Sequence, residues 1–384
     1  MTNVSVYGCS KREIKNLTNY QLAVAKWMFQ HPQQKGLLVC YATGTGKTLV
    51  GANVAEVLMR HNRIRHVLVV CRKSLVNNFI QALCLCTGEV PSQNQNAMAT
   101  RCKAPPNMTV VSITQFVRKP PPTIDPDTLL IVDEAHWYRN PHNNESRAVK
   151  AAADRCKHVL LLTADPFVNG PSDIANLMHM IVPPVEYARF PLDKKQFDAM
   201  YLQNPEAFVD AVRNLVATHD ETNTSTKPRV TERINMVPLS FEQIKEIEAI
   251  RTKNFSKYNL TDTLIKKVFE LALKRRGNQE GLPNLKNINS FLTLVRQASN
   301  TVDGKESECA PKIAQLVTTV TRPQTPKPVI IYSEFYDKGV KNVYTCLLKA
   351  GVKSNRVAMF TGRVNSIAER QNIVTRYNNG EIDY

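Results

Sequence analysis

Short runs of consecutive apolar residues alternate with longer amphipathic segments through the first half of the chain. Uninterrupted apolar runs separated by helical segments are typical of a parallel sheet that helices cover on both faces. The runs that predict strands are GLLVCYA at 36–42, HVLVVC at 66–71, MTVVSI at 108–113, TLLIVD at 128–133 and HVLLLTA at 158–164. Helical patterns such as residues 47–61 lie between them. We therefore predict an α/β lobe over residues 1–185.

The pattern changes in the second half of the chain. Residues 186–304 have mainly helical periodicity, including an amphipathic helix expected at 260–277, and we interpret them as a helical insertion or linker. Two further apolar runs, PVIIYSEF at 328–335 and RVAMFTG at 356–362, predict strands of a second α/β unit. Because two strands are fewer than an ordinary sheet contains, residues 305–384 are predicted to be the first part of that unit.

The charge of the chain is strongly positive, because 50 Lys and Arg residues outnumber 33 Asp and Glu residues and give a net charge of +17. This excess favours a polyanionic partner, most simply nucleic acid, although a merely basic surface is an alternative. The sequence starts without a signal-peptide pattern, and no apolar run approaches the roughly 20 residues that span a bilayer. We expect a soluble, intracellular protein with no membrane partner, and its oligomeric state stays open.

Nine cysteines lie at irregular positions, which favours reduced thiols in an intracellular protein. A zinc site at Cys84, Cys86 and Cys102 is the alternative, but the CxC spacing has no matching second pair. Reduced thiols are therefore the preferred interpretation.

A glycine-rich segment, YATGTGKT at 41–48, follows the first predicted strand. Glycines let a backbone wrap around phosphate oxygens, and the helix that follows adds its positive N-terminal end. Lys47 can reach the β- and γ-phosphates of ATP, and the Thr48 hydroxyl can bind Mg²⁺. The loop residues expected to surround the phosphates are Thr43, Gly44, Thr45 and Gly46. Tyr41 occupies the first glycine position of the usual GxxxxGK[ST] pattern, so a purely structural turn is the alternative.

An acidic segment, LLIVDEAH at 129–136, ends the fourth predicted strand. Asp133 is placed to hold Mg²⁺, and Glu134 to orient or deprotonate the attacking water. His136 can form a hydrogen bond that senses the nucleotide state. Because ligands collect at the carboxyl ends of parallel strands, the two segments together predict an ATP hydrolase. An acidic strand end without a metal is the alternative.

Taken together, these two segments resemble the DEAH-box helicases and translocases of superfamily 2. Further segments similar to that family, several of them to its Swi/Snf branch, follow in the family's order. They are LTNYQLAVAKWM at 17–28, VVCRKSLVNNF at 69–79, VVSITQF at 110–116, LLLTADPFVN at 160–169, SFLTLVRQASN at 290–300, PVIIYSEF at 328–335 and MFTGRVNSIAERQNIVTRYNNG at 359–380. The resemblance implies one complete RecA-like lobe, a mainly helical insertion and the first part of a second RecA-like lobe.

The resemblance also implies roles for five further residues. Gln21 would read adenine, and Ser74 and Thr114 would contact phosphates along one tracked strand. For Ser74, a helix N-cap is an equally good interpretation. Thr163 and Asp165 would couple hydrolysis to movement, although the family carries a second hydroxyl where this chain has Asp165.

Two other departures from the family bear on activity. Arg72 stands where proline is usual. The arginines of the family's last motifs, which are worth roughly 10³–10⁵ in rate, have no counterpart in residues 305–384. We therefore expect this chain to bind ATP and nucleic acid weakly and to hydrolyse ATP slowly.

The preferred function is an ATP-dependent nucleic-acid translocase or helicase with Mg²⁺ as cofactor and DNA, rather than RNA, as partner. The compactness of the chain and the sequence FVNGPSDIANLM at 167–178 look most like the Swi/Snf-type ATPases of large DNA viruses, including nucleoside triphosphatase I and the early transcription factor ATPase. That similarity implies contacts with transcription machinery, in the host cytoplasm or the virion. The alternative is a non-catalytic transcription subunit that binds ATP or DNA. The motor subunit of a restriction enzyme would need a nuclease carboxylate–lysine cluster, which the sequence lacks.

Overall fold

The computed structural model describes residues 17–88, 103–121, 123–167, 170–219, 231–258, 261, 263, 285–302, 309–363 and 367–384. The chain divides into two compact units, unit 1 at Met1–Lys227 and unit 2 at Pro228–Tyr384. The division into three parts at 185/186 and 304/305 stays a prediction.

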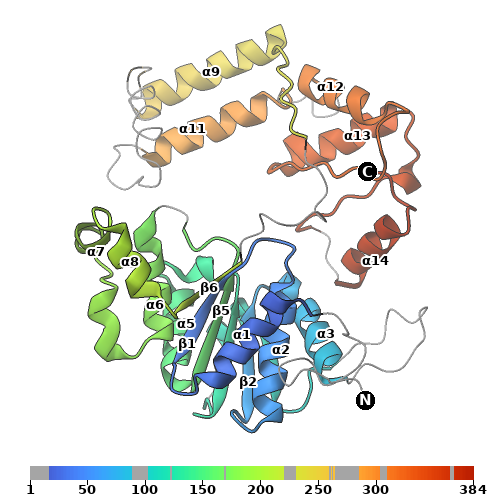
Figure 1. Cartoon of the computed structure of the whole chain (residues 1–384). Coiled ribbons are helices and arrows are strands. Elements are labelled where there is room, and N and C mark those ends of the chain that lie inside the picture. Colours follow the sequence, from blue (N-terminus) through green and yellow to red (C-terminus); the bar gives the residue numbers. More distant parts are fainter. Residues whose placement is uncertain are drawn as a thin grey trace. The chain divides into compact units, whose positions relative to one another are not determined.

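Unit 1 is built on a six-stranded parallel sheet with the order β3-β2-β4-β5-β1-β6 (Figure 1). Its strands are β1 (Gly36–Cys40), β2 (His66–Cys71), β3 (Met108–Ser112), β4 (Thr128–Asp133), β5 (His158–Thr163) and β6 (Val216–Thr218). The first five coincide with the predicted runs, so the parallel α/β lobe is confirmed. Strand β6 was not expected, because three residues are too short for any periodicity to mark them.

Helices cover both faces of this sheet (Figure 1). Those on one face are α1 (Asn19–Gln30), α2 (Lys47–Arg60) and α3 (Val76–Thr87); those on the other are α4 (Ile113–Arg118), α5 (Asn144–Arg155) and α6 (Ile174–Ile181). Neighbouring residues of β4 alternate between the two cores, with Ile131 packed under α1–α3 and Leu130 under α4–α6. Side chains of a strand point to opposite faces in turn, which explains why the predicted runs are continuously apolar.

The remaining helices of unit 1 complete its second face and its connections. They are the α-helices α7 (Lys194–Tyr201) and α8 (Pro205–Val212), and the 3-10 helices η1 (Lys73–Leu75), η2 (Ala135–Tyr138), η3 (Pro171–Asp173) and η4 (Pro184–Arg189). Phe197 and Tyr201 of α7 meet Phe208 of α8 edge to face, with ring centroids 6.0 and 5.5 Å apart. This aromatic cluster ties the two helices to the core under β4 and β5.

Unit 2 is mainly helical within its described residues. In chain order, its helices are α9 (Phe241–Tyr258), α11 (Leu285–Ala298), α12 (Pro311–Val320), η5 (Tyr336–Lys341, a π-helix), α13 (Asn342–Lys349), η6 (Ser354–Arg356) and α14 (Ile367–Asn378). The helix predicted at 260–277 lies outside the described residues except for 261 and 263. A small core of α12 and α13 surrounds a disulfide between Cys309 and Cys346. The prediction of reduced thiols is therefore wrong for this pair, while Cys102 of the zinc alternative is not among the described residues.

The two strands predicted in unit 2 are not formed, so this expectation is wrong. Residues 328–335 and 357–362 form no regular element, Arg356 ends η6, and the described part of unit 2 contains no strand. Residues 383–384 lie between them, with Val329 N–H donating to the Asp383 carbonyl at 2.7 Å and Ala358 N–H to the Tyr384 carbonyl at 3.0 Å. A strand needs a ladder of such bonds along its length, and these few do not make one.

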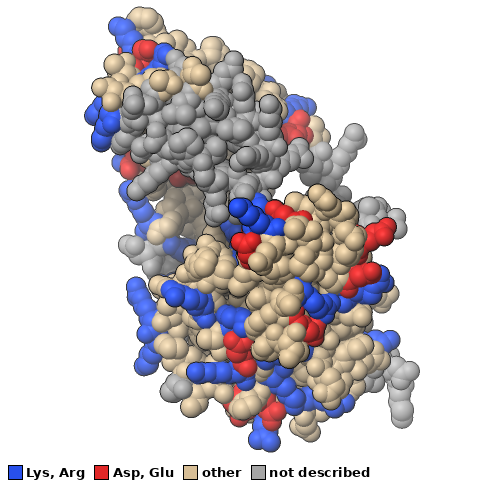
Figure 2. Space-filling view, turned by 90° about the vertical axis from the view of Figure 1, so that its left-hand side faces the viewer, with Lys and Arg blue, Asp and Glu red and all other residues tan. Residues whose placement is uncertain are grey.

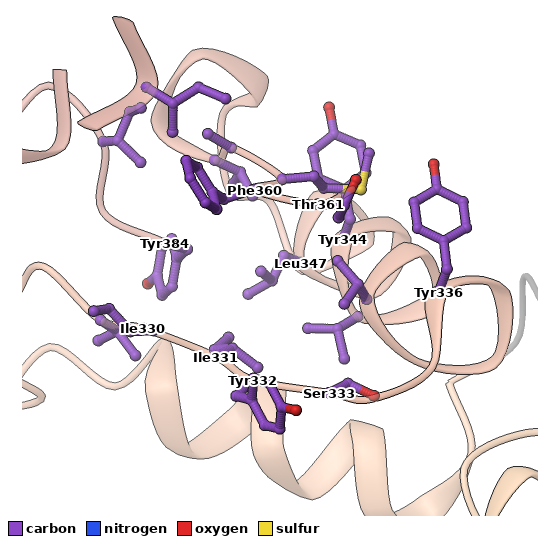
Figure 3. A pocket seen from close by; sticks show the side chains of 18 of the residues that line it. Ile330, Ile331, Tyr332, Ser333, Tyr336, Tyr344, Leu347, Phe360, Thr361 and Tyr384 are labelled. Carbon is purple, nitrogen blue, oxygen red and sulfur yellow. The ribbon is translucent and has the colours of Figure 1, made fainter. Parts of the chain in front are cut away.

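An apolar cavity of about 630 Å³ opens beside these two runs (Figure 3). Ile331, Leu347, Phe360 and Tyr384 line it together with Tyr332, which is 83% exposed. The apolar runs of unit 2 thus border an open space rather than a filled core. Among the described residues, no helix is both long enough and apolar enough to cross a membrane.

Candidate nucleotide-binding site

The glycine loop, defined here as residues 41–46, connects β1 to α2 at the carboxyl edge of the sheet. Gly44 and Gly46 have φ angles of 87° and 79°, a left-handed conformation that side chains other than glycine's disfavour. A Cβ atom on Gly46 would lie 2.6 Å from the Gln21 amide nitrogen. Position 46 therefore requires glycine for both its conformation and its space.

Lys47 begins helix α2 and is buried beneath the glycine loop, with 9% of its surface exposed. Its Nζ donates to the carbonyl oxygens of Tyr41 at 3.0 Å and Ala42 at 3.2 Å. The first N–H groups of α2 have no acceptor inside the helix, and Thr48 follows in the same turn. A buried ammonium and a helix N-terminus on one loop form a suitable site for phosphate.

Two side chains of α1 hold this loop in place. The Gln21 amide donates to the Thr45 carbonyl at 2.9 Å, and its Oε1 accepts from Thr18 N–H at 2.9 Å. The Tyr20 hydroxyl donates to the same Thr45 carbonyl at 3.1 Å. On its other side, the Tyr20 ring stacks on His219, just past β6, with centroids 3.9 Å apart. Thr45 is therefore the point at which α1 fixes the loop.

Tyr41, which replaces the usual first glycine, is accommodated by the core. It is 2% exposed, and its hydroxyl donates to the Tyr20 carbonyl at 3.0 Å. Burial raises the pKa of Tyr41 to about 12, so the hydroxyl stays a proton donor. The substitution therefore strengthens the attachment of the loop to α1 and leaves the side toward Thr43 and Gly44 open, where both residues are exposed.

The acidic pair lies at the end of β4. Asp133 is 5% exposed, and its Oδ1 accepts from Glu134 N–H at 3.0 Å. Burial raises the pKa of Asp133 to about 6, the Glu134 charge adds to this shift, and the Lys47 charge opposes it. A buried carboxyl with this surplus of negative charge fits a divalent cation. Glu134 itself has a φ of 52°, a left-handed conformation that is uncommon for residues other than glycine.

His136 joins the acidic pair to β5. Its Nδ1 lies 3.0 Å from the Thr163 hydroxyl and 3.4 Å from Glu134 Oε2. The Thr163 hydroxyl donates its proton to the Asp165 carbonyl at 3.2 Å, so we assign the proton between His136 and Thr163 to Nδ1. Burial lowers the pKa of His136, and nearby Arg139 and Arg72 act in the same direction against the pull of Glu134. The imidazole is therefore neutral near pH 7.

The sheet order explains why these groups meet. Strand β5 lies between β1 and β4, with Thr163 opposite Cys40 and Leu162 opposite Asp133. Thr163, fully buried at the end of β5, is thus inserted between the glycine loop and the acidic pair. The Asp165 carboxylate, in contrast, is exposed and accepts Phe167 N–H at 2.9 Å within its own turn.

Ser74 and Thr114, the predicted phosphate contacts, are exposed at the ends of neighbouring strands. Strands β2 and β3 pair in register up to Cys71 opposite Ser112, which brings η1 and α4 to one edge. The N-cap of α3 is Leu75, without a side-chain bond, so the alternative role of Ser74 as an N-cap is wrong. Both hydroxyls are accessible for a ligand.

Sequence reasoning missed several residues that support the site. Arg139 donates to the His136 carbonyl at 2.9 Å and lies 3.6 Å from Asp173. The Arg72 guanidinium covers the Trp137 ring at 3.8 Å. The substitution of the family's proline by Arg72 was a signal in the sequence. Arg139 gave none, because its contact with Asp173 forms only on folding.

Basic and acidic side chains are interspersed over the described surface on the face that Figure 2 shows. Within the described residues, no group of three or more His, Cys, Asp or Glu side chains could hold a metal ion by itself. A magnesium ion at Asp133 and Thr48 would therefore take most of its ligands from water and nucleotide phosphates, as Mg²⁺ commonly does.

The parallel sheet, the glycine loop over a buried lysine and the acidic pair one strand away form the arrangement expected of a P-loop nucleotide site. Residues 14–168 match the protein family described as "Type III restriction enzyme, res subunit". The matched part contains the glycine loop, the acidic pair and β5.

Two solved structures are similar to the whole chain. The Sulfolobus solfataricus SWI2/SNF2 ATPase core in complex with dsDNA has 17% identity and a TM-score of 0.48, covering 100% of this chain and 79% of its own. The ATPase core domain of the same protein has 16% identity and a TM-score of 0.46, covering 99% and 76%. No curated protein matches the chain.

Proposed function

We propose that the chain is a nucleic-acid-stimulated ATPase that moves along DNA. The observation that carries this proposal is the link from Glu134 through His136 to Thr163, placed by β5 between the glycine loop and the acidic pair. A groove for a nucleotide alone needs no such link. A motor needs one, because its water-activating group must respond to structural change elsewhere.

Each residue of the site has a separable task. Lys47 and the N-terminus of α2 bind the phosphates, with Thr43, Gly44, Thr45 and Gly46 around them. Bound Mg-ATP supplies the phosphoryl group and the cation that offsets its charge. Asp133 and Thr48 would hold that cation, and Glu134 would orient the attacking water.

Gln21 is proposed first as a positioning residue. Both polar ends of its side chain are bonded to the protein, at Thr45 and Thr18. Adenine recognition by Gln21 would require one of these bonds to open. With both hydrogen bonds formed, the role of Gln21 is to hold Thr45 in position.

The nucleic acid is proposed to lie along the edge that carries Ser74 and Thr114. Exposed hydroxyls there suit a phosphate backbone, because such contacts position a strand without reading its sequence. The net charge of +17 favours the same partner. The similarity to transcription ATPases of large DNA viruses rests on the sequence segments alone and stays a prediction.

The test measures ATP binding, DNA binding and turnover separately on the 384-residue chain. We expect Lys47→Ala to abolish binding of a fluorescent ATP analogue, and Glu134→Gln to keep binding but remove DNA-stimulated hydrolysis. Lys195→Ala, an exposed lysine of α7, is the matched control and should change neither.

The outcomes separate the candidate functions. Hydrolysis stimulated by duplex DNA and lost in Glu134→Gln supports the motor. ATP binding without any turnover favours the non-catalytic subunit instead. ATP binding that survives Lys47→Ala would contradict the nucleotide site itself.

A further inference from the structure

Arg72 and Trp137 meet at the edge of the sheet where β2 and β4 end. These strands are hydrogen-bonded neighbours with Val70 opposite Val132, so the residues that follow each strand lie side by side. The Arg72 guanidinium carbon is 3.8 Å from the centroid of the Trp137 ring, within the range of a cation–π contact. Trp137 is still 48% exposed, so the core does not enclose this ring.

The two partners belong to segments with different proposed tasks. Arg72 is the N-cap of η1, which carries Ser74 of the nucleic-acid edge. Trp137 follows His136, which contacts Glu134 and Thr163. The stack is therefore a direct side-chain contact between the nucleic-acid edge and the segment of the acidic pair.

The segment on the Trp137 side is a stiff turn. Trp137 N–H donates to the Glu134 carbonyl at 3.1 Å, which ties the tryptophan backbone to the residue that orients water. Arg139 holds the His136 carbonyl and contacts Asp173. Because the turn is fixed at both ends, a displacement of the Trp137 ring is passed to Glu134 instead of being absorbed locally.

We propose that Arg72 is a positioning residue that conveys nucleic-acid contact at η1 to Glu134 through the Trp137 ring. The proposal rests on the proposed function, because it names the route by which DNA stimulates hydrolysis. The simplest rival is that Arg72 binds a DNA phosphate directly, since its side chain is exposed.

Tryptophan fluorescence tests the route without requiring turnover. Trp27 and Trp137 are the two tryptophans, so Trp27→Phe leaves Trp137 as the reporter. Binding of a labelled duplex is followed separately by anisotropy. We expect duplex DNA to change the Trp137 emission with the same saturation curve as the anisotropy, and Arg72→Ala to remove this change. Duplex binding without a change in Trp137 emission would overturn the coupling, whereas no duplex binding would overturn the proposed function.

Turnover and salt dependence exclude the rival. In Arg72→Ala and in Trp137→Ala, DNA stimulation should fall about tenfold, and the double variant should be no worse than either, because both changes break one stack. Additive losses would contradict the route. The dependence of DNA affinity on salt should match that of Arg147→Ala, an exposed arginine of α5 that serves as charge control. A slope lowered by about 1 in Arg72→Ala alone would show that Arg72 binds a phosphate and overturn the proposal.

Discussion

Units 1 and 2 contain apolar runs of the same kind, but these runs differ in burial and in strand pairing. Ile131, in TLLIVD of unit 1, is fully buried between two hydrogen-bonded neighbour strands. Ile330, in PVIIYSEF of unit 2, is 79% exposed beside an open cavity. An apolar run therefore becomes a strand where neighbouring strands accept its backbone bonds, and its own composition is not sufficient.

The largest expected effect compares these two isoleucines directly. Ile131→Ala should lower the free energy of unfolding by about 2–5 kcal/mol, because it leaves a cavity in a packed core. Ile330→Ala should change it by less than about 0.5 kcal/mol, because the side chain is mostly in water. Urea denaturation followed by far-ultraviolet circular dichroism measures both. Equal losses would show that the run in unit 2 is packed after all.

The second effect concerns the acidic pair of unit 1, where burial of the charged Asp133 carboxylate lowers the stability of the fold. The pKa of Asp133 is raised from 3.8 to about 6, so the native state binds more protons than the unfolded state between these values. The contribution of this carboxyl to stability is therefore fully present below pH 3.8 and is lost as pH rises through about 6, by about 3 kcal/mol in total.

Asp133→Asn removes this dependence. Without divalent cations, the variant should be more stable than the parent by up to about 3 kcal/mol near pH 8 and by little near pH 4. Tryptophan-monitored urea denaturation in a chelator is the measurement. Asp337→Asn in unit 2, an exposed carboxyl, serves as the control. A constant difference across this pH range would refute the linkage.

A smaller effect compares the buried Thr163 of unit 1 with Thr319 of unit 2. Thr163→Val removes the hydroxyl that meets His136 and should cost about 1–2 kcal/mol, together with much of the DNA-stimulated turnover. Thr319→Val in unit 2 removes an exposed hydroxyl bonded to its own helix and should cost less than about 0.5 kcal/mol. Thermal denaturation and steady-state hydrolysis report the two outcomes. Unchanged turnover in Thr163→Val would remove His136 and Thr163 from the coupling.

The smallest effect concerns Asp165. Its carboxylate caps its own turn through Phe167 N–H, so Asp165→Thr should change stability by less than about 1 kcal/mol. The added hydroxyl restores the usual family residue, and ATPase activity should be preserved or raised. A large loss of activity would show that the carboxylate has a positive role in this chain.

The sequence predicted the part of the molecule in which local pattern and tertiary partners agree. Strands β1–β5 are continuous apolar runs, and each finds a neighbour, so pattern and structure coincide. The glycine loop and Asp133–Glu134 could be placed because short motifs specify both their residues and their positions at strand ends.

The misses share one physical cause, which is dependence on distant partners. Strand β6 exists because Val216–Thr218 find the edge of β1. The stack of Tyr20 on His219 and the contact of Arg139 with Asp173 likewise depend on folding that brings separate segments together. In unit 2 the dependence on distant partners removed a predicted strand. The apolar run at 328–335 forms no ladder of backbone hydrogen bonds with another strand among the described residues.

The position of β6 has a mechanical consequence. Thr218 ends the short pairing with β1, and His219 is the last described residue of unit 1. Its ring stacks on Tyr20, and Tyr20 holds the Thr45 carbonyl of the glycine loop. A displacement of His219 would therefore reach the phosphate site through two side chains, so the end of β6 is placed to exchange strain with a bound nucleotide.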